Sequence, residues 1–315
     1  MGFVRLCEED TTIQWLLEGD PSIRWQTLRD LEGADDQVVK RERHLVSETG
    51  WGARLLCNQE PSGQWGGGLY SPKWISTTYT MLLLRRLGLP PEHPQASRAC
   101  ALLLDRGVYP DGGINYFTTL KHSETCVTGM ILAILAYFHF PDDRVDVLAS
   151  YLLEQQMKDG GWNCQTYKGA THGSFHTTIS VLEGLYEYEK FHPQRIQEIR
   201  ETQSRGCEFL LAHRLFRSHR TGEIVNPAMT RFSFPPRWRY DILRALDYFQ
   251  DCGAERNERL EDAIKVVRKR QKKGGRWLLQ NRHPGRTFFE MEKAGEASRW
   301  NTLRALRILR WWGDS

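Results

Sequence analysis

Residues 156–164 read QMKDGGWNC, a glycine pair and a tryptophan that separate a helical pattern from a polar loop. The same arrangement occurs in SGQWGGGLY at residues 62–70, and in PDGGINYF at residues 110–117, where Ile114 replaces the tryptophan. Looser copies of the unit begin at Phe209 and Val266. The chain therefore repeats itself with a period of roughly 50 residues, which is typical of repeat architectures.

Each unit joins two helical runs through its glycine-rich turn and polar loop. Apolar residues recur every three or four positions in the second run, as at Ile179, Leu182 and Tyr186, and strand-like alternation is absent. Glycine can end a helix because the left-handed conformation costs it nothing. These patterns predict an all-α fold in which neighbouring units bury one another's apolar faces.

A second repeated phrase indicates that the N-terminal segment also belongs to the repeat pattern. The phrase arginine, aromatic residue, two variable residues, leucine, arginine recurs at residues 24–29, 239–244 and 299–304. The first of these belongs to a partial unit, and we expect it to complete the last unit and close a ring. The whole chain, residues 1–315, is then one domain. Its units lie roughly at residues 11–50, 51–95, 96–140, 145–190, 200–250 and 257–312.

Composition excludes several classes of protein. The 315-residue chain carries 43 Lys and Arg against 39 Asp and Glu, too balanced for a dedicated nucleic-acid binder. Its start has no apolar leader, and its longest apolar run, residues 126–140, is shorter than the ~20 residues of a membrane span. Seven scattered cysteines favour reduced thiols. We expect a cytoplasmic protein without nucleic-acid partner or membrane insertion.

The glycine-rich turns quoted above resemble the Q-x-x-x-G-x-W repeats of squalene and oxidosqualene cyclases and the glycine-rich repeats of protein prenyltransferase β-subunits. The resemblance covers residues 15–312. It implies an (α/α) toroid of about six helical hairpins around a central cavity, with chemistry at the N-terminal ends of the inner helices. The cyclases' D-x-D-D acid motif is missing here. Asp142, Asp143 and Asp146 form a D-D-x-x-D string that we interpret as helix capping.

The resemblance to the prenyltransferases also implies a zinc ion, held there by an Asp-x-Cys and a histidine. Here Glu124 and Cys126 occupy the matching positions, and His176 starts the next inner helix, with His122 as a rival ligand. Carboxylate, thiolate and imidazole suit a zinc site that keeps one position open. In the alternative interpretation, Glu124 caps a helix, Cys126 is a small buried residue and His176 belongs to the core.

Other candidate residues rest on weaker signals. Candidate catalytic residues are Arg239, Tyr240 and Asp241. Aromatic side chains expected to line an apolar cavity are Trp74, Tyr116, Phe175, Trp238 and Trp300. Aromatic residues at repeat positions serve packing more often than ligand binding.

Three functions remain open at this point. The first is a zinc-dependent transferase that acts on an isoprenoid or another apolar small molecule and needs no second subunit. The second is a metal-independent cyclase, which the missing acid motif disfavours. The third is a non-catalytic helical-repeat protein that binds a ligand or a peptide.

Overall fold

The computed structural model describes residues 11–314. The start of the chain, on which the expectation of no leader rests, and Cys7 lie outside these residues. The described part is all-α, as expected, with isolated bridges but no strand. None of its helices is long and apolar enough to cross a membrane.

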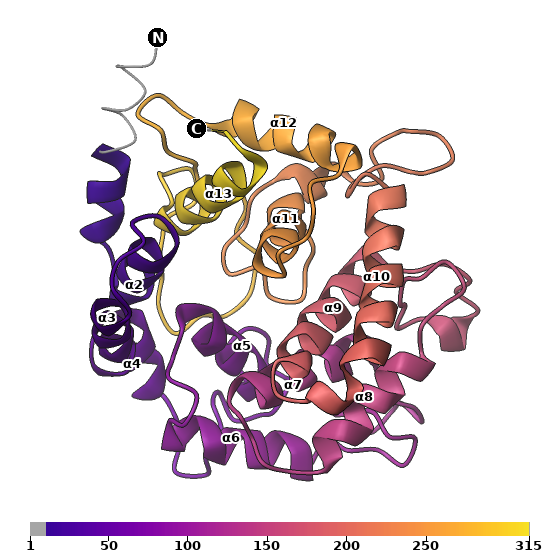
Figure 1. The fold of residues 1–315 in the computed structure, drawn as a ribbon. Helices are drawn as coiled ribbons and strands as arrows, with labels where there is room; N and C mark the ends of the chain where they lie inside the picture. Colours follow the sequence, from indigo (N-terminus) through magenta and orange to yellow (C-terminus); the bar gives the residue numbers. More distant parts are fainter. Residues whose placement is uncertain (1–10, 315) are drawn as a thin grey trace.

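Six hairpins form a closed ring (Figure 1). The inner helices are α2 (Pro21–Asp30), α5 (Thr77–Leu87), α7 (Thr125–Tyr137), α9 (Phe175–Glu189), α11 (Ile242–Asp251) and α13 (Arg299–Trp312). The outer layer contains helical residues 11–17, then α3 (Asp36–Glu48), α4 (Gly50–Leu56), α6 (Pro94–Asp105), α8 (Arg144–Glu154), α10 (Ile196–Ala212) and α12 (Glu261–Arg270). The fold is therefore the (α/α) toroid that the repeats predict.

The N-terminal segment closes the ring, because α2 packs between α13 and α5. Arg307 of α13 pairs with Asp30 of α2 at 2.9 Å. On the other side of α2, the Trp25 indole N–H donates to the Leu87 carbonyl at the end of α5, at 2.9 Å. The first contact joins the two ends of the sequence, and the second joins α2 to the inner helix of the next unit. Closure of the ring therefore depends on tertiary packing.

The repeated tryptophan has a repeated physical role. Trp65, Trp162 and Trp277 are fully buried, and each indole N–H donates to a carbonyl ten residues earlier, at 2.7–2.8 Å. The backbone N–H of Trp162 donates to the Thr178 hydroxyl at 3.0 Å, and Trp65 and Trp277 have equivalent threonine partners. One side chain thus fastens the outer helix, the turn and the inner helix of its unit.

The fifth unit departs from this pattern, since Ile224 is 42% exposed, whereas Trp65, Ile114, Trp162 and Trp277 are buried. It lies in the long connection between α10 and α11.

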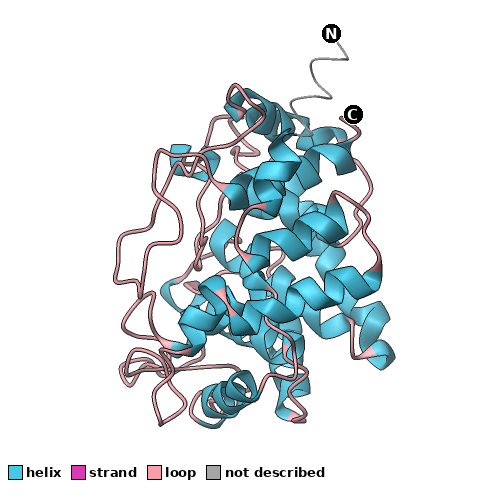
Figure 2. Cartoon of the chain, turned by 90° about the vertical axis from the view of Figure 1, so that its left-hand side faces the viewer, coloured by secondary structure: helices cyan, strands magenta, loops and turns pink. Residues whose placement is uncertain are grey.

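The ring has two unlike faces. Long connections precede the inner helices at residues 57–76, 106–124, 155–174, 213–241 and 271–298, whereas those that follow them are short. The long connections gather along one side of the helices in Figure 2. We call this side, at the N-terminal ends of the inner helices, the N-terminal face, and the opposite side the C-terminal face.

Candidate functional site

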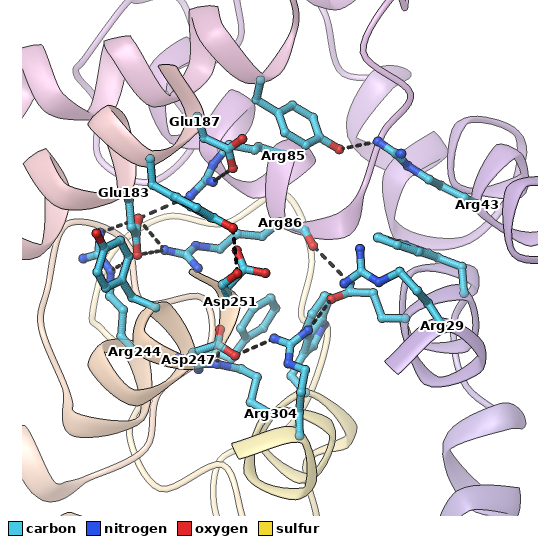
Figure 3. A pocket seen from close by; sticks show the side chains of 18 of the residues that line it. Arg29, Arg43, Arg85, Arg86, Glu183, Glu187, Arg244, Asp247, Asp251 and Arg304 are labelled. Carbon is cyan, nitrogen blue, oxygen red and sulfur yellow. Dashed lines mark hydrogen bonds and ion pairs between the residues drawn. The ribbon is translucent and has the colours of Figure 1, made fainter. Parts of the chain in front are cut away.

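A central cavity of about 210 Å³ lies toward the C-terminal face (Figure 3). Trp25, Phe234 and Trp300 form an aromatic part of its wall, and the rest is strongly charged. Its cationic side chains are Arg29, Arg43, Arg85, Arg86, Lys190, Arg244, Arg304 and Arg307. Its carboxylates are Glu183, Glu187, Asp247 and Asp251. The eight cations outnumber the four carboxylates two to one.

Glu183 of α9 organises the first group of charges, which we call the Glu183 cluster: Arg85, Arg86, Glu183, Glu187 and Arg244. Its carboxylate accepts from Arg86 of α5 at 2.7 Å and from Arg244 of α11 at 2.8 Å. Arg85 pairs with Glu187 at 2.7 Å and reaches Glu183 at 3.3 Å. The cluster therefore ties three inner helices together (Figure 3).

The pKa values within the Glu183 cluster reflect burial and crowding of like charges. Burial alone would raise the pKa of Glu183, but the charges of Arg244 and Arg86 outweigh burial and hold it well below its ordinary value. Burial lowers the pKa of Arg86 to about 10; Glu183 opposes this shift, and Arg244, Arg85 and Arg304 add to it. Arg86 is therefore buried beside one carboxylate and several other arginines.

The second group, the Asp247 cluster, consists of Asp30, Asp247, Arg304 and Arg307. Asp247 pairs with Arg304 at 3.2 Å and also with Arg307, which reaches Asp30. Burial opposes ionisation of Asp247, and the two arginines overcome this and lower its pKa. Three buried guanidinium nitrogens of the two clusters have no hydrogen-bond partner: Arg85 Nε, Arg304 Nη2 and Arg307 Nε.

Two further side chains at the cavity differ from the clusters. Arg43 of α3 donates to the Gly88 carbonyl and to the Tyr137 hydroxyl, both at 2.9 Å, and pairs with no carboxylate of the described residues. Asp251, the last residue of α11, lines the cavity and forms no ion pair with any residue that the structure describes. Loss of hydration raises its pKa, although Arg307 and Lys190 act in the opposite direction.

On the N-terminal face, the predicted zinc ligands are held by other contacts. Glu124 is the N-cap residue of α7 and makes no side-chain capping bond, and burial raises its pKa. The Cys126 thiol lies near Cys164, and this neighbour, together with burial, raises the pKa of Cys126. Cys164 in turn contacts the Thr177 hydroxyl at 3.2 Å.

The two histidines have other partners. His176 Nδ1 accepts from the Tyr240 backbone N–H at 2.8 Å, and its ring lies edge-on to Trp238. Burial lowers the pKa of His176 to about 4, and Arg244 and Arg239 add to the shift. The rival His122 packs against Tyr167. Residues 11–314 contain no group of three or more His, Cys, Asp or Glu arranged to hold a metal ion. In this arrangement the predicted ligands do not fit a zinc ion, and zinc binding stays a prediction.

The candidate catalytic residues have structural partners. Asp241 caps α11, accepting from the Arg244 backbone N–H at 2.8 Å and from the Ser233 hydroxyl at 2.7 Å. The buried Tyr240 hydroxyl donates to the Leu215 carbonyl at 2.6 Å. The Arg239 guanidinium lies over the Trp238 ring.

Of the five aromatic residues expected at the cavity, only Trp300 borders the central cavity, stacked on Phe234. Tyr116 lines a separate groove of about 510 Å³ between loops of the N-terminal face. Phe175 packs between Phe209 and Tyr240 instead of facing the cavity. Trp238 contacts His176, as described above.

Trp74 lies under a segment, residues 281–292, that we call the strap. Its indole N–H donates to the Pro284 carbonyl at 2.7 Å. The spaces beneath the strap, which Arg237 and Phe289 help to line, measure only about 20 and 30 Å³. The apolar cavity expected at the N-terminal ends of the inner helices is therefore closed by the strap.

The charged residues of the cavity were not among the sequence candidates, although one signal pointed to them. The last arginine of each copy of the arginine-aromatic phrase, namely Arg29, Arg244 and Arg304, lines the central cavity. The recurrence of an arginine at the same position of the phrase, on three inner helices, is the feature that could have identified the site.

Comparisons with known proteins identify no family. No protein-family model matches the chain, and no curated protein matches its sequence. A solved structure of a protein from Actinoplanes is similar over 93% of this chain and 90% of its own, with 15% identity and a TM-score of 0.45. The type II terpene cyclase MstE from Scytonema, solved as a variant with merosterolic acid A, is similar over 86% of this chain and 96% of its own, with 12% identity and a TM-score of 0.35. Similarities of this size carry no argument about activity or ligand.

Proposed function

We propose that the protein binds a small anionic molecule, such as a phosphate or diphosphate ester, in the central cavity, and acts on it as an enzyme of the transferase or cyclase type. The observation that carries this proposal is the excess of cationic side chains, eight against four carboxylates, around one cavity. Charge-assisted hydrogen bonds from arginine to phosphate oxygens are among the strongest polar contacts in proteins.

Favourable interactions with helix dipoles explain only some of these cationic side chains. Cations at the last turn of a helix complement its dipole, which suits Arg85, Arg86 and Lys190 near the ends of α5 and α9. Arg244 and Arg304 lie in the first half of their helices, where the dipole does not favour a cation. Three buried guanidinium nitrogens of the two clusters have no hydrogen-bond partner among the described residues. An anion in the cavity would supply acceptors for such donors.

The size and wall of the cavity limit the ligand. Its 210 Å³ is below the ~300–1,000 Å³ of pockets for drug-sized molecules. Trp25, Phe234 and Trp300 offer an apolar surface for a short hydrocarbon or aromatic group. Within this proposal an isoprenoid-type substrate is a short one, with its charged end among the arginines. The enzymatic part of the proposal rests on the resemblance of the repeats, since fold alone does not determine activity.

Calorimetric titration with inorganic pyrophosphate at pH 7 tests the binding. We expect binding by the wild type and about tenfold weaker binding by Arg86→Gln, because that change removes a charged hydrogen-bond donor while Arg85 and Arg244 still hold Glu183. Arg220→Gln, in an exposed loop away from the cavity, is the matched control and keeps wild-type affinity. A wild-type protein that binds no pyrophosphate at millimolar concentration excludes this function.

Turnover separates the enzyme from a ligand-binding protein. Incubation with short allylic diphosphates, with water or an added thiol or amine as the acceptor of the prenyl group, should release pyrophosphate if the protein is a transferase or an ionising cyclase. A cyclase that protonates its substrate would instead yield a cyclic product that keeps the diphosphate. Binding of the same esters with neither outcome, under conditions where the protein stays folded, would make it a non-catalytic binding protein.

The zinc ion of the initial prediction has its own test, elemental analysis of protein purified without chelator. The predicted site requires about one zinc per chain, lost in Cys126→Ala and His176→Ala and kept in Cys164→Ala. Loss in Cys164→Ala instead of His176→Ala would place the ion at the thiol pair. A wild type without zinc would leave Cys126 and His176 with the structural contacts described above.

A further inference from the structure

Asp251 is the one carboxylate of the cavity wall that forms no ion pair within residues 11–314. Glu183, Glu187 and Asp247 each accept from at least two cations. Asp251 is an exposed residue that lines the cavity, and partial loss of hydration raises the pKa of its carboxyl. Figure 3 shows it between the Glu183 cluster and the Asp247 cluster.

The charges that face Asp251 come from three elements. Arg307 approaches from α13 and Lys190 from the end of α9, and both attract its carboxylate. Glu187 of α9 and Asp247 of α11 repel it. Tyr186 of α9 donates its hydroxyl proton to the Asp251 backbone carbonyl at 2.6 Å and leaves the carboxylate free. Arg29 of α2 lines the same cavity, and no histidine does so among the described residues.

An anion in this cavity meets the arginines and Asp251 together. Two negative charges a few ångströms apart, partly shielded from water, cost several kcal/mol unless one is neutralised. Arginine keeps its charge, so protonation of Asp251 is the available response. A protonated carboxyl also gains an O–H donor, which a ligand oxygen can accept.

We propose that Asp251 couples binding of the anion to uptake of one proton, so that the cavity holds an anionic ligand together with a protonated carboxyl that donates a hydrogen bond to it. This inference rests on the proposed function and adds a property of the ligand, an oxygen that can accept this hydrogen bond. The raised pKa of Asp251 in the free protein has the direction that the coupling requires. Asp251 acts here as a positioning residue.

The test uses sodium sulfate, which keeps both of its charges between pH 5.5 and pH 8, so that any proton taken up is bound by the protein. Calorimetric titrations of the full chain are made at the two pH values at constant ionic strength, in two buffers that differ in ionisation enthalpy. We expect uptake of about one proton per bound sulfate at pH 5.5, and about tenfold weaker binding at pH 8.

The variant Asp251→Asn replaces the carboxyl with a neutral amide of the same shape. It should bind sulfate with less than about a twofold change between the two pH values and without proton uptake at this site. Asp143→Asn, an exposed aspartate outside the cavity, should keep the wild-type pH dependence. Proton uptake is measured on the wild type alone, so the test remains valid even if Asp251→Asn folds poorly.

The outcomes distinguish this inference from the proposed function. Equal affinity at both pH values without proton uptake contradicts the inference, as does unchanged proton uptake in Asp251→Asn. Binding of pyrophosphate but of no sulfate at either pH also contradicts it, because a neutral Asp251 should admit any small dianion. A protein that binds neither anion contradicts the proposed function and this inference together.

Discussion

The two faces of the ring differ in how they satisfy buried polar groups. On the N-terminal face, long loops supply partners one by one: the Tyr240 N–H meets His176, and the Trp74 indole meets Pro284. On the C-terminal face, short turns leave the space open, and charged side chains of α5, α9, α11 and α13 must satisfy one another. On the loop-covered face the strap closes the centre of the ring, whereas the charged face keeps a cavity whose cations outnumber its carboxylates.

The largest expected effect is at the centre of the Glu183 cluster. Glu183→Gln removes the charge that Arg85, Arg86 and Arg244 share and leaves three cations close together. Breaking a buried ion pair in this way costs about 3–5 kcal/mol of unfolding free energy. Chemical unfolding of the variant measures this loss, and Glu255→Gln, at an exposed position, is the control.

Comparing the stability of Glu183→Gln and the wild type with and without sodium sulfate tests where the unmatched charge lies. We expect it to stabilise Glu183→Gln more than the wild type, because the variant has a larger excess of positive charge around the cavity. An equal shift of the melting temperature in both proteins would indicate that the unmatched charge lies outside the cavity, contrary to our description of this face.

The two faces should also differ, by a smaller amount, in the pH range over which their buried groups stabilise the fold. The pKa values of His176 and His283 are lowered from the ordinary 6.5 to about 4, first by burial. The neutral histidines therefore stabilise the fold fully above pH 6.5, and this contribution is lost as the pH falls from 6.5 toward 4. Lowered pKa values in the carboxylates Glu183 and Asp247 give stability that is lost only below their ordinary values of 4.5 and 3.8.

Acid unfolding of the wild type should thus begin on the N-terminal face. His176→Gln should flatten the fall in unfolding free energy between pH 6.5 and 4 by about 1–2 kcal/mol, with little change below pH 4. A variant whose stability falls as steeply as that of the wild type across this range would show that His176 titrates normally in the folded protein.

The smallest expected effect concerns the strap. Gly285 has φ +153°, and a Cβ at this position would lie 2.2 Å from the Trp74 ring. Gly285→Ala should therefore displace the strap and lower the unfolding free energy by about 1–3 kcal/mol. Anion affinity in the cavity should stay unchanged, because the strap residues do not line it. Weaker anion binding in Gly285→Ala would mean that the two faces are coupled.

The sequence could predict features whose contacts lie within one repeat unit, and it could not predict contacts between different units. The ring of hairpins was predictable because glycine turns, tryptophan and helical periodicity act within one unit of about 50 residues, and Trp162 makes its hydrogen bonds to Leu152 and Thr178 inside that span. The aligned positions of Cys126 and His176 were equally visible. Their contacts were not, since Cys126 meets a loop residue, Cys164, and His176 meets the backbone of the following unit.

By itself, the sequence determined the all-α class and the order of the hairpins, because these follow from local patterns that the units repeat. Only the tertiary structure decided where the cavity opens and what charge it carries. Arg86, Glu183 and Arg244 come from three units, and no local pattern states that their side chains meet. The physical reason is that burying a charge costs free energy unless the charge is paired, and the geometry of the closed ring decides which charges are close enough to pair.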